Sequence, residues 1–268
     1  MKGLFGSPRR VAAIARNTFI EAGRNRAFIG LGIAAIGLVA SSMAVSGLAI
    51  ADQMARVLVD FGLFAISLLE VVIAVTMGVI LVFKEIDRKT FYVVLTKPIR
   101  RSEVLAGKFF GLAAILAIAL VLMAAAWVGS LLLRDVPLRH DMVQALVLTW
   151  MQALLITSVA LFFSSFASPV LSGVFTLGVY LAGTSIYVLE DLLAGRKGML
   201  ATNEAARAVA KAAVVGLPDL SVFNLGKELI LGIPIGWDYV AAAGAYCAGW
   251  IVLFWALAAL IFERRDFA

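Results

Sequence analysis

The chain has 268 residues, of which 63% are hydrophobic and 15% charged, and its formal net charge is +6. A soluble domain of this length is nearer half apolar and a quarter charged, so the composition excludes an ordinary soluble protein and indicates helices that span a membrane. The single cysteine, Cys247, and the single histidine, His140, give no basis for a disulfide framework or for Cys/His catalysis. In a membrane protein, basic residues usually mark the cytoplasmic loops, so the positive charge indicates topology and we expect no nucleic-acid partner.

The first 26 residues are basic and are predicted to form an interfacial helix. Ser7 and Pro8 suit a helix start, as a capping residue followed by proline in the first turn. Small or apolar residues then recur at three-to-four spacing, at Val11, Ile14, Ala15, Thr18, Phe19 and Ala22. Such a stripe on a cationic helix suits the surface of an anionic membrane; a solvated basic tail is the alternative.

Six apolar runs follow, each of about 20 residues or more and long enough to cross the hydrocarbon core as a helix. They cover residues 27–50, 61–83, 109–133, 142–166, 170–189 and 239–262. The first run is longer than the hydrophobic region of a signal peptide, so we interpret it as a retained span. The predicted fold class is an all-α membrane protein with six transmembrane helices, and residues 1–268 form a single transmembrane permease-like domain.

The distribution of charge predicts the orientation. Six spans place both termini on one side, and 15 of the 23 Lys and Arg residues fall on that side, in residues 1–26, the segment 84–108 and the C-terminal tail. Cationic loops stay cytoplasmic, which predicts both termini inside (N-in/C-in) in a multi-pass protein of the bacterial cytoplasmic (inner) membrane. Residues 190–238 are then an external helical segment. It is predicted to hold a short helix at 203–215, and residues 223–233 suit a second short helix that lies on the membrane surface or dips into it.

Residues 84–108, here called the connector, form the most charged internal segment. Pro98 disfavours helix at the residue before it, and Ser102 with Glu103 suits the start of a new helix that continues into the third span. An apolar face precedes the break, at Phe91, Val94 and Leu95. The pattern predicts a helix, a break and a second helix on the membrane surface; a solvated loop that follows the charge rule is the alternative.

A family resemblance rests on the order of residues in this connector. Glu85, Thr90, Leu95, Pro98, Arg101 and the pair Gly107-Lys108 follow one another at the spacing of a known signature. The segment resembles the one after the second span of ABC type-2 exporter permeases, roughly E-x-x-x-G-T, a leucine cluster, P-x-x-R and G-K. Lys89 stands where that family usually has glycine. An F-x-E-x-x-R-N-R pattern ending at Arg26 and an F-E-R-R-D-F ending also agree. Within the family, the chain is most similar to permeases of multicopper-enzyme maturation.

The resemblance implies a non-catalytic permease subunit that works with a second permease copy, identical or different, and a dimer of cytoplasmic ATPase subunits. It implies that the connector docks on the ATPase through Glu85, Arg88, Lys89, Thr90, Leu95, Pro98 and Arg101. ATP and Mg²⁺ would be held by the ATPase, with no cofactor in this chain. The sequence has no G-x-x-x-x-G-K-[ST]; Gly107-Lys108-Phe109 and Gly226-Lys227-Glu228 lack the loop and the Ser or Thr.

Glu70 lies near the middle of the second predicted span, where an ionised carboxylate is costly unless it is paired. It is a candidate cavity residue on a substrate path; a structural residue hydrogen-bonded to a nearby Ser or Thr is the alternative. Tyr180 in the fifth span is a second candidate for the path, with packing as the alternative. The pattern Gly107-x-x-x-Gly111 favours close helix packing. Aromatic residues near span ends suggest interfacial anchors, at Trp127, Trp150, Trp237 and Tyr239.

Other functions remain as alternatives. An intramembrane enzyme needs clustered acids or Ser/His pairs within its spans, and a secondary transporter usually has several buried ionisable groups. Glu70 is the only ionisable residue clearly inside a predicted span. A scaffold subunit without an ATPase partner is a further alternative. We interpret the polar link 134–141, with Asp135, His140 and Asp141, as a link and not as a metal site.

Overall fold

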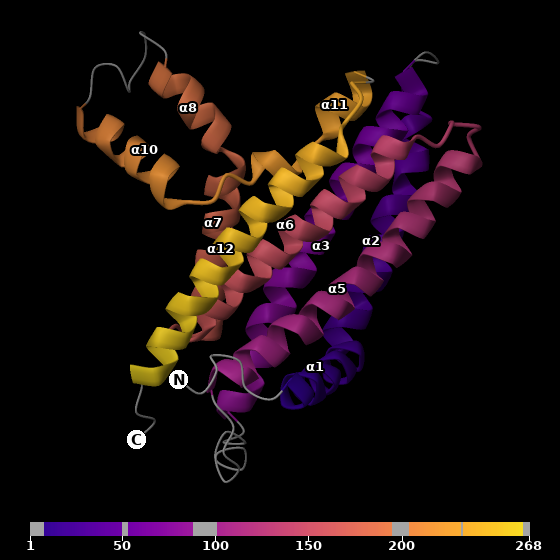
Figure 1. Ribbon diagram of the computed structural model, residues 1–268. Helices are drawn as coiled ribbons and strands as arrows, with labels where there is room; N and C mark the ends of the chain where they lie inside the picture. Colours follow the sequence, from indigo (N-terminus) through magenta and orange to yellow (C-terminus); the bar gives the residue numbers. More distant parts are fainter. Residues whose placement is uncertain (1–7, 50–52, 88–100, 195–203, 232, 265–268) are drawn as a thin grey trace.

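The computed structural model describes residues 8–49, 53–87, 101–194, 204–231 and 233–264, and these residues are helical with no strand. Most of the chain is built of long apolar helices that run side by side (Figure 1). Five of them are long and apolar enough to cross a membrane. They are α2 (Arg26–Ser46), α3 (Met54–Asp87), α5 (Arg101–Leu132), α6 (His140–Ser164) and α12 (Trp237–Arg264).

A sixth candidate span is formed by two shorter helices, α7 (Pro169–Thr184) and α8 (Ile186–Ala194), which meet at a bend of 49°. Ser168 occupies the N-cap position of α7 and Pro169 lies in its first turn, where proline is tolerated because the N–H it lacks has no partner within the helix. The predicted all-helical membrane class is therefore confirmed, with five or six candidate spans among the described residues.

The structure corrects the predicted start of the second span and shifts the helix ends next to the connector. The helix α3 begins at Met54, inside the link predicted to precede residue 61, because Leu58 and Val59 continue its buried face. At its other end the helix continues through Asp87, so the first residues of the connector are helical, while the apolar span within α3 ends at Leu81. The helix after the connector starts at Arg101, one residue before the predicted capping serine.

The core lies where α3 and α6 pack together between the other helices, and its side chains are apolar with a few internal hydrogen bonds. Trp127 is fully buried there: its indole Nε1 donates to the Leu58 carbonyl at 3.4 Å, and a Cβ at Gly62 would lie 2.2 Å from the same nitrogen. Trp127 is thus a core residue and not the interfacial anchor that its place near a span end suggests. Trp237, in contrast, is exposed at the start of α12.

The two ends of the bundle differ in what they carry (Figure 1). At one end, α3 stops, α5 starts, α12 ends, and α1 (Pro8–Gly23) lies against α5; we call this the connector end. The opposite end, called the far end, carries α8, α10 (Glu204–Gly216), the short turn η2 (Ser221–Phe223) and α11 (Gly226–Leu231). The predicted helix at 203–215 is confirmed as α10. The one predicted at 223–233 is shorter, because Asn224 interrupts it and caps α11 through Oδ1.

Candidate functional site

The two helices that flank the connector are tied together at its base. Lys108 is buried, with 3% of its surface exposed, and its Nζ donates to the Leu81 carbonyl of α3 at 3.1 Å. A buried ammonium needs such an acceptor, because an unpaired charge away from water is costly. The hydrogen bond joins the last part of α3 to the first part of α5.

The residues predicted to contact an ATPase belong to this segment. Glu85 lies in the last turn of α3 and Arg101 is the first residue of α5. The remaining predicted contacts lie outside the described residues: Arg88, Lys89, Thr90, Leu95 and Pro98. Their spacing remains the basis for assigning them a role.

The helix α1 is seated on the first part of α5 through two glycines. A Cβ at Gly107 would lie 2.6 Å from Cβ and Cγ2 of Ile14, and one at Gly111 would lie 2.6 Å from the Ala15 carbonyl oxygen. Real Cβ atoms do not approach so closely, so both positions need glycine, as in other close helix crossings in membranes. The apolar stripe of α1 is therefore as predicted, but it packs on α5, with Thr18 buried.

Glu70 is enclosed in the middle of the bundle. Its side chain has no exposed surface, and neither carboxyl oxygen has a hydrogen-bond partner in the part of the chain that the structure describes. Ser67, one turn earlier, donates instead to Gln152 at 3.1 Å. The register of the antiparallel helices α3 and α5 follows from two contacts, Gly62 with Trp127 and Leu81 with Lys108. In this register, Glu70 lies at the same level as buried Ala119. An ionised carboxylate is costly in such surroundings.

Tyr180, the second candidate for the substrate path, lies half-buried on α7 and packs against the core. Two hydroxyl residues of the same helix, Ser172 and Thr176, are fully buried. The structure therefore places Glu70 in the centre of the bundle and Tyr180 at its edge.

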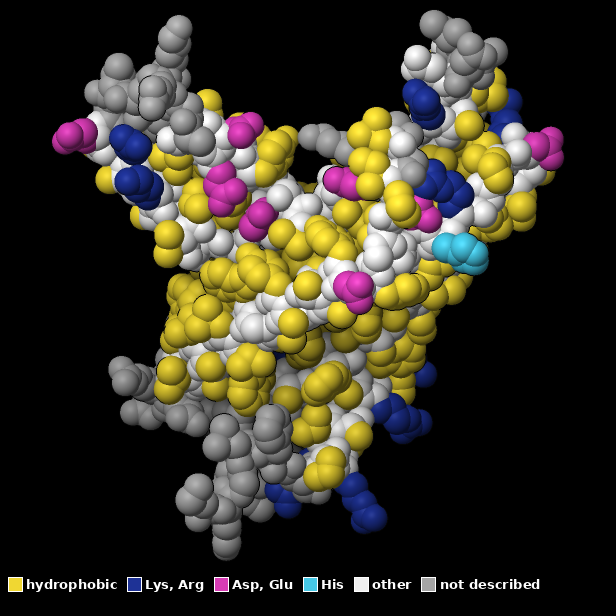
Figure 2. All heavy atoms as spheres, turned by 45° about the horizontal axis from the view of Figure 1, so that its top comes forward, with side chains coloured by type: hydrophobic (Ala, Val, Ile, Leu, Met, Phe, Trp, Pro, Cys, Tyr) yellow, Lys and Arg dark blue, Asp and Glu magenta, His cyan; other side chains and the backbone are white. Residues whose placement is uncertain are grey.

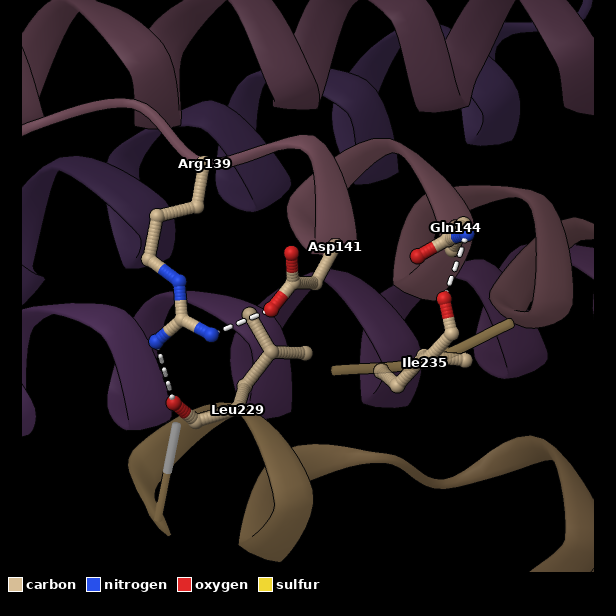
Figure 3. Close-up of polar contacts among 5 residues, drawn as sticks. All are labelled: Arg139, Asp141, Gln144, Leu229 and Ile235. Carbon is tan, nitrogen blue, oxygen red and sulfur yellow. Dashed lines mark hydrogen bonds and ion pairs between the residues drawn. The ribbon is translucent and has the colours of Figure 1, made fainter. Parts of the chain in front are cut away.

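At the far end, side chains at the start of α6 donate hydrogen bonds to the backbone of residues 217–236, a segment here called the strap (Figure 3). Arg139 donates from Nη1 to the Leu229 carbonyl at 3.1 Å and pairs with Asp141, and Gln144 donates from Nε2 to the Ile235 carbonyl at 2.8 Å. The polar link thus binds a neighbouring backbone. Sequence reasoning missed this role, although a glutamine within an apolar run was a signal that it needs a partner.

These features define a class of protein: a multi-pass membrane protein with buried polar side chains, in which Lys108 of α5 is hydrogen-bonded to α3 at the connector end. Residues 12–267 match the family described as ABC-2 family transporter protein, and the chain belongs to this family. It is therefore a membrane-embedded permease component of the ABC transporter kind. A comparison with curated protein sequences finds no significant match.

Proposed function

We propose that this chain is the permease subunit of an ATP-driven exporter and couples ATP hydrolysis on a separate ATPase dimer to movement of substrate. The observation that carries the proposal is the base of the connector, where Lys108 ties α5 to the Leu81 carbonyl of α3. An ATPase that pushes on the connector then moves both helices together. A second permease copy, the same or different, completes the membrane part.

The tie matters because of what α3 and α5 contact. The helix α3 packs against α2, α5, α6 and α7, and its core face is buried along most of its length. The base of α5 carries α1 through Gly107 and Gly111. A displacement of the connector therefore reaches the core of the bundle and α1 at once, because close-packed helices shift as units.

The charge distribution supports a cytoplasmic position for the connector end. That end carries α1 and the connector with their excess of Lys and Arg, and such loops stay inside. The proposal places both termini in the cytoplasm of a bacterium and the far end outside. Catalysis, ATP and Mg²⁺ belong to the ATPase partner, so this subunit itself is not an enzyme.

Co-purification tests the proposal. We expect the chain, extracted in mild detergent from cells of its native host, to retain an ABC ATPase subunit. The double variant Glu85→Ala with Arg101→Ala is expected to lose both the ATPase and transport. Arg207→Ala is the matched control, because Arg207 is an exposed charge at the far end. Wild-type transport by the double variant, or a wild-type chain that purifies without any ATPase, would contradict the proposal.

A further inference from the structure

A cleft opens in the surface of the bundle where α5, α6 and α12 meet. Its empty volume is about 200 Å³, which includes the space at its open side. Apart from Ser158, the residues that line it are apolar or aromatic, among them Leu105, Phe109 and Leu161. None of the described residues in the lining carries a charge. The cleft therefore suits a ligand that is apolar where it touches the protein.

The single hydroxyl of the lining offers no free donor. Ser158 has 3% of its surface exposed, and its Oγ donates to the Leu155 carbonyl at 2.7 Å. The hydroxyl proton is thus used within α6 itself. A polar ligand would give up its hydrogen bonds to water without receiving this proton, which is costly, so the lining favours hydrocarbon.

The cleft spans the connector-side half of the membrane thickness. The apolar span of α12 ends at Ile261, and the lining residues Ala258 and Ile251 precede that residue by three and ten positions. At 1.5 Å per residue they lie about 5 and 15 Å from the membrane boundary, within a hydrocarbon core about 30 Å thick. On α5, Leu105 follows Glu103, where the apolar span begins, by two positions. Acyl chains of the connector-side leaflet surround the bundle at this depth.

The width of the cleft excludes a further helix. The helices α5 and α12 pack against each other as well as against α6, and helices in contact have axes about 8–10 Å apart. A helix with its side chains is about 10–12 Å wide, too wide to enter between two helices at that spacing. An acyl chain is a single row of methylene groups and fits between them.

Basic residues stand at the ends of both helices that border the cleft. Arg101 begins α5, one turn before Leu105, and Arg264 ends α12, six residues after Ala258. Figure 2 shows hydrophobic side chains over the middle of the bundle and basic side chains at its connector end. Positive charge at this level attracts anionic lipid headgroups.

We propose that the cleft between α5, α6 and α12 holds an acyl chain of an anionic phospholipid from the connector-side leaflet, as a resident lipid that stays with the protein. The bound chain completes the packing between α5 and α12, because an unfilled space forfeits van der Waals contacts. The inference needs only a chain that spans the membrane and is independent of ATP coupling.

Lipid retention tests the site. The full chain is reconstituted in phosphatidylethanolamine and phosphatidylglycerol, extracted again in detergent and washed, and its phospholipids are quantified by mass spectrometry. We expect the wild type to retain phosphatidylglycerol in an equimolar amount. Ile251→Trp places a larger side chain in the cleft and should lower retention about tenfold, the effect of displacing about two buried methylene groups. Val252→Trp is the matched control, because its neighbouring position has 63% of its surface exposed.

Fluorescence provides a second measurement that leaves the packing of the wild type unchanged. Trp255 borders the cleft, so a phospholipid with brominated acyl chains should quench its emission after the same extraction and wash. We expect the wild type to lose a larger fraction of its emission than Trp255→Phe, which lacks this indole. This comparison decides the question if Ile251→Trp does not elute as a folded protein.

Four results would overturn the inference. A washed wild type without phospholipid or quenching would show that only exchangeable lipid contacts the cleft. Equal retention by Ile251→Trp and Val252→Trp would place the lipid elsewhere. A disulfide between two copies through Ile251→Cys, without retained lipid, would assign the cleft to a second copy. Retained lipid with the composition of the mixture would exclude selection of an anionic headgroup.

Discussion

Single buried polar residues carry most of the functional interest of this chain, and Glu70 is the clearest case. Both carboxyl oxygens are enclosed without a hydrogen-bond partner among the described residues. Core packing does not require an acid at that position, since an apolar side chain would fit the surroundings at lower cost. We therefore keep Glu70 as a candidate contact for substrate or for a partner span, reached when the helices around it separate.

Glu70→Gln tests this role because it keeps the size of the side chain and removes its charge. If Glu70 contacts substrate, we expect transport to fall about tenfold or more at unchanged expression, the effect of losing one charge-assisted hydrogen bond. Ser67→Ala, one turn away on the same helix, is the matched control. Transport rates equal to wild type across the pH range would assign Glu70 a structural role only.

For single residues, the sequence predicts which of them lie within a span, but it does not predict which residues of other helices they contact. The place of Glu70 within a span is read directly from the apolar residues around it. The burial of Trp127 is not, because the space for its indole is made by Gly62 in another helix. Likewise, Lys108 stands at the start of a span, where lysines usually reach outward to water, yet it turns inward to the Leu81 carbonyl.

Among the helices, the crossing of α1 and α5 depends on local shape. We expect Gly107→Ala to lower the stability of the protein by about 1–3 kcal/mol, because the new methyl group would overlap with Ile14. Gly129→Ala is the control on the same helix: nothing lies within 4 Å of that Cβ. Thermal unfolding in detergent measures both, and equal midpoints would show that α1 is not seated on α5 through these glycines.

The strap at the far end gives a second prediction at the scale of elements. Arg139→Leu combined with Gln144→Leu removes both side-chain donors that hold the Leu229 and Ile235 carbonyls. Because each hydrogen bond contributes about 1 kcal/mol, local opening should increase about tenfold or more. Hydrogen exchange of peptides covering residues 217–236 measures the opening, with Arg207→Leu as control. Unchanged exchange would show that the other contacts of the strap hold it without these two donors, among them buried Leu225 and Leu229 and the bond from the Tyr239 hydroxyl to the Val222 carbonyl.

Helix bounds were mostly predictable, and the reasons for the exceptions are physical. Proline after serine marks the start of α7, and α10 follows its alanine-rich pattern. The early start of α3 was missed because Arg56 and Asp60 resemble a polar link, although they lie on the exposed side of a helix whose other face is buried. The bend at Ser185 was missed although Gly183 and Ser185 lie at it, a pair often found at helix kinks, because the apolar run continues on both sides.

For the whole molecule, the testable statement is its orientation. We expect a membrane-impermeant thiol reagent to label Leu138→Cys, exposed at the far end, in intact cells. Asn17→Cys, exposed on α1 at the connector end, should be labelled only after the membrane is opened. The physical reason is the excess of Lys and Arg on the connector side, which resists translocation. The opposite labelling pattern would invert the orientation and exclude an ATPase at the connector.

The bond from Lys108 to the Leu81 carbonyl has a consequence for how such permeases diversify. Its acceptor is a main-chain atom, so this hydrogen bond does not depend on which side chain occupies position 81. On the proposed function, partner recognition by residues 88–100 and the packing of the membrane helices are separate properties. We expect that exchanging residues 88–100 for those of a related permease changes which ATPase co-purifies with the chain. The packing of the membrane helices is expected to stay the same.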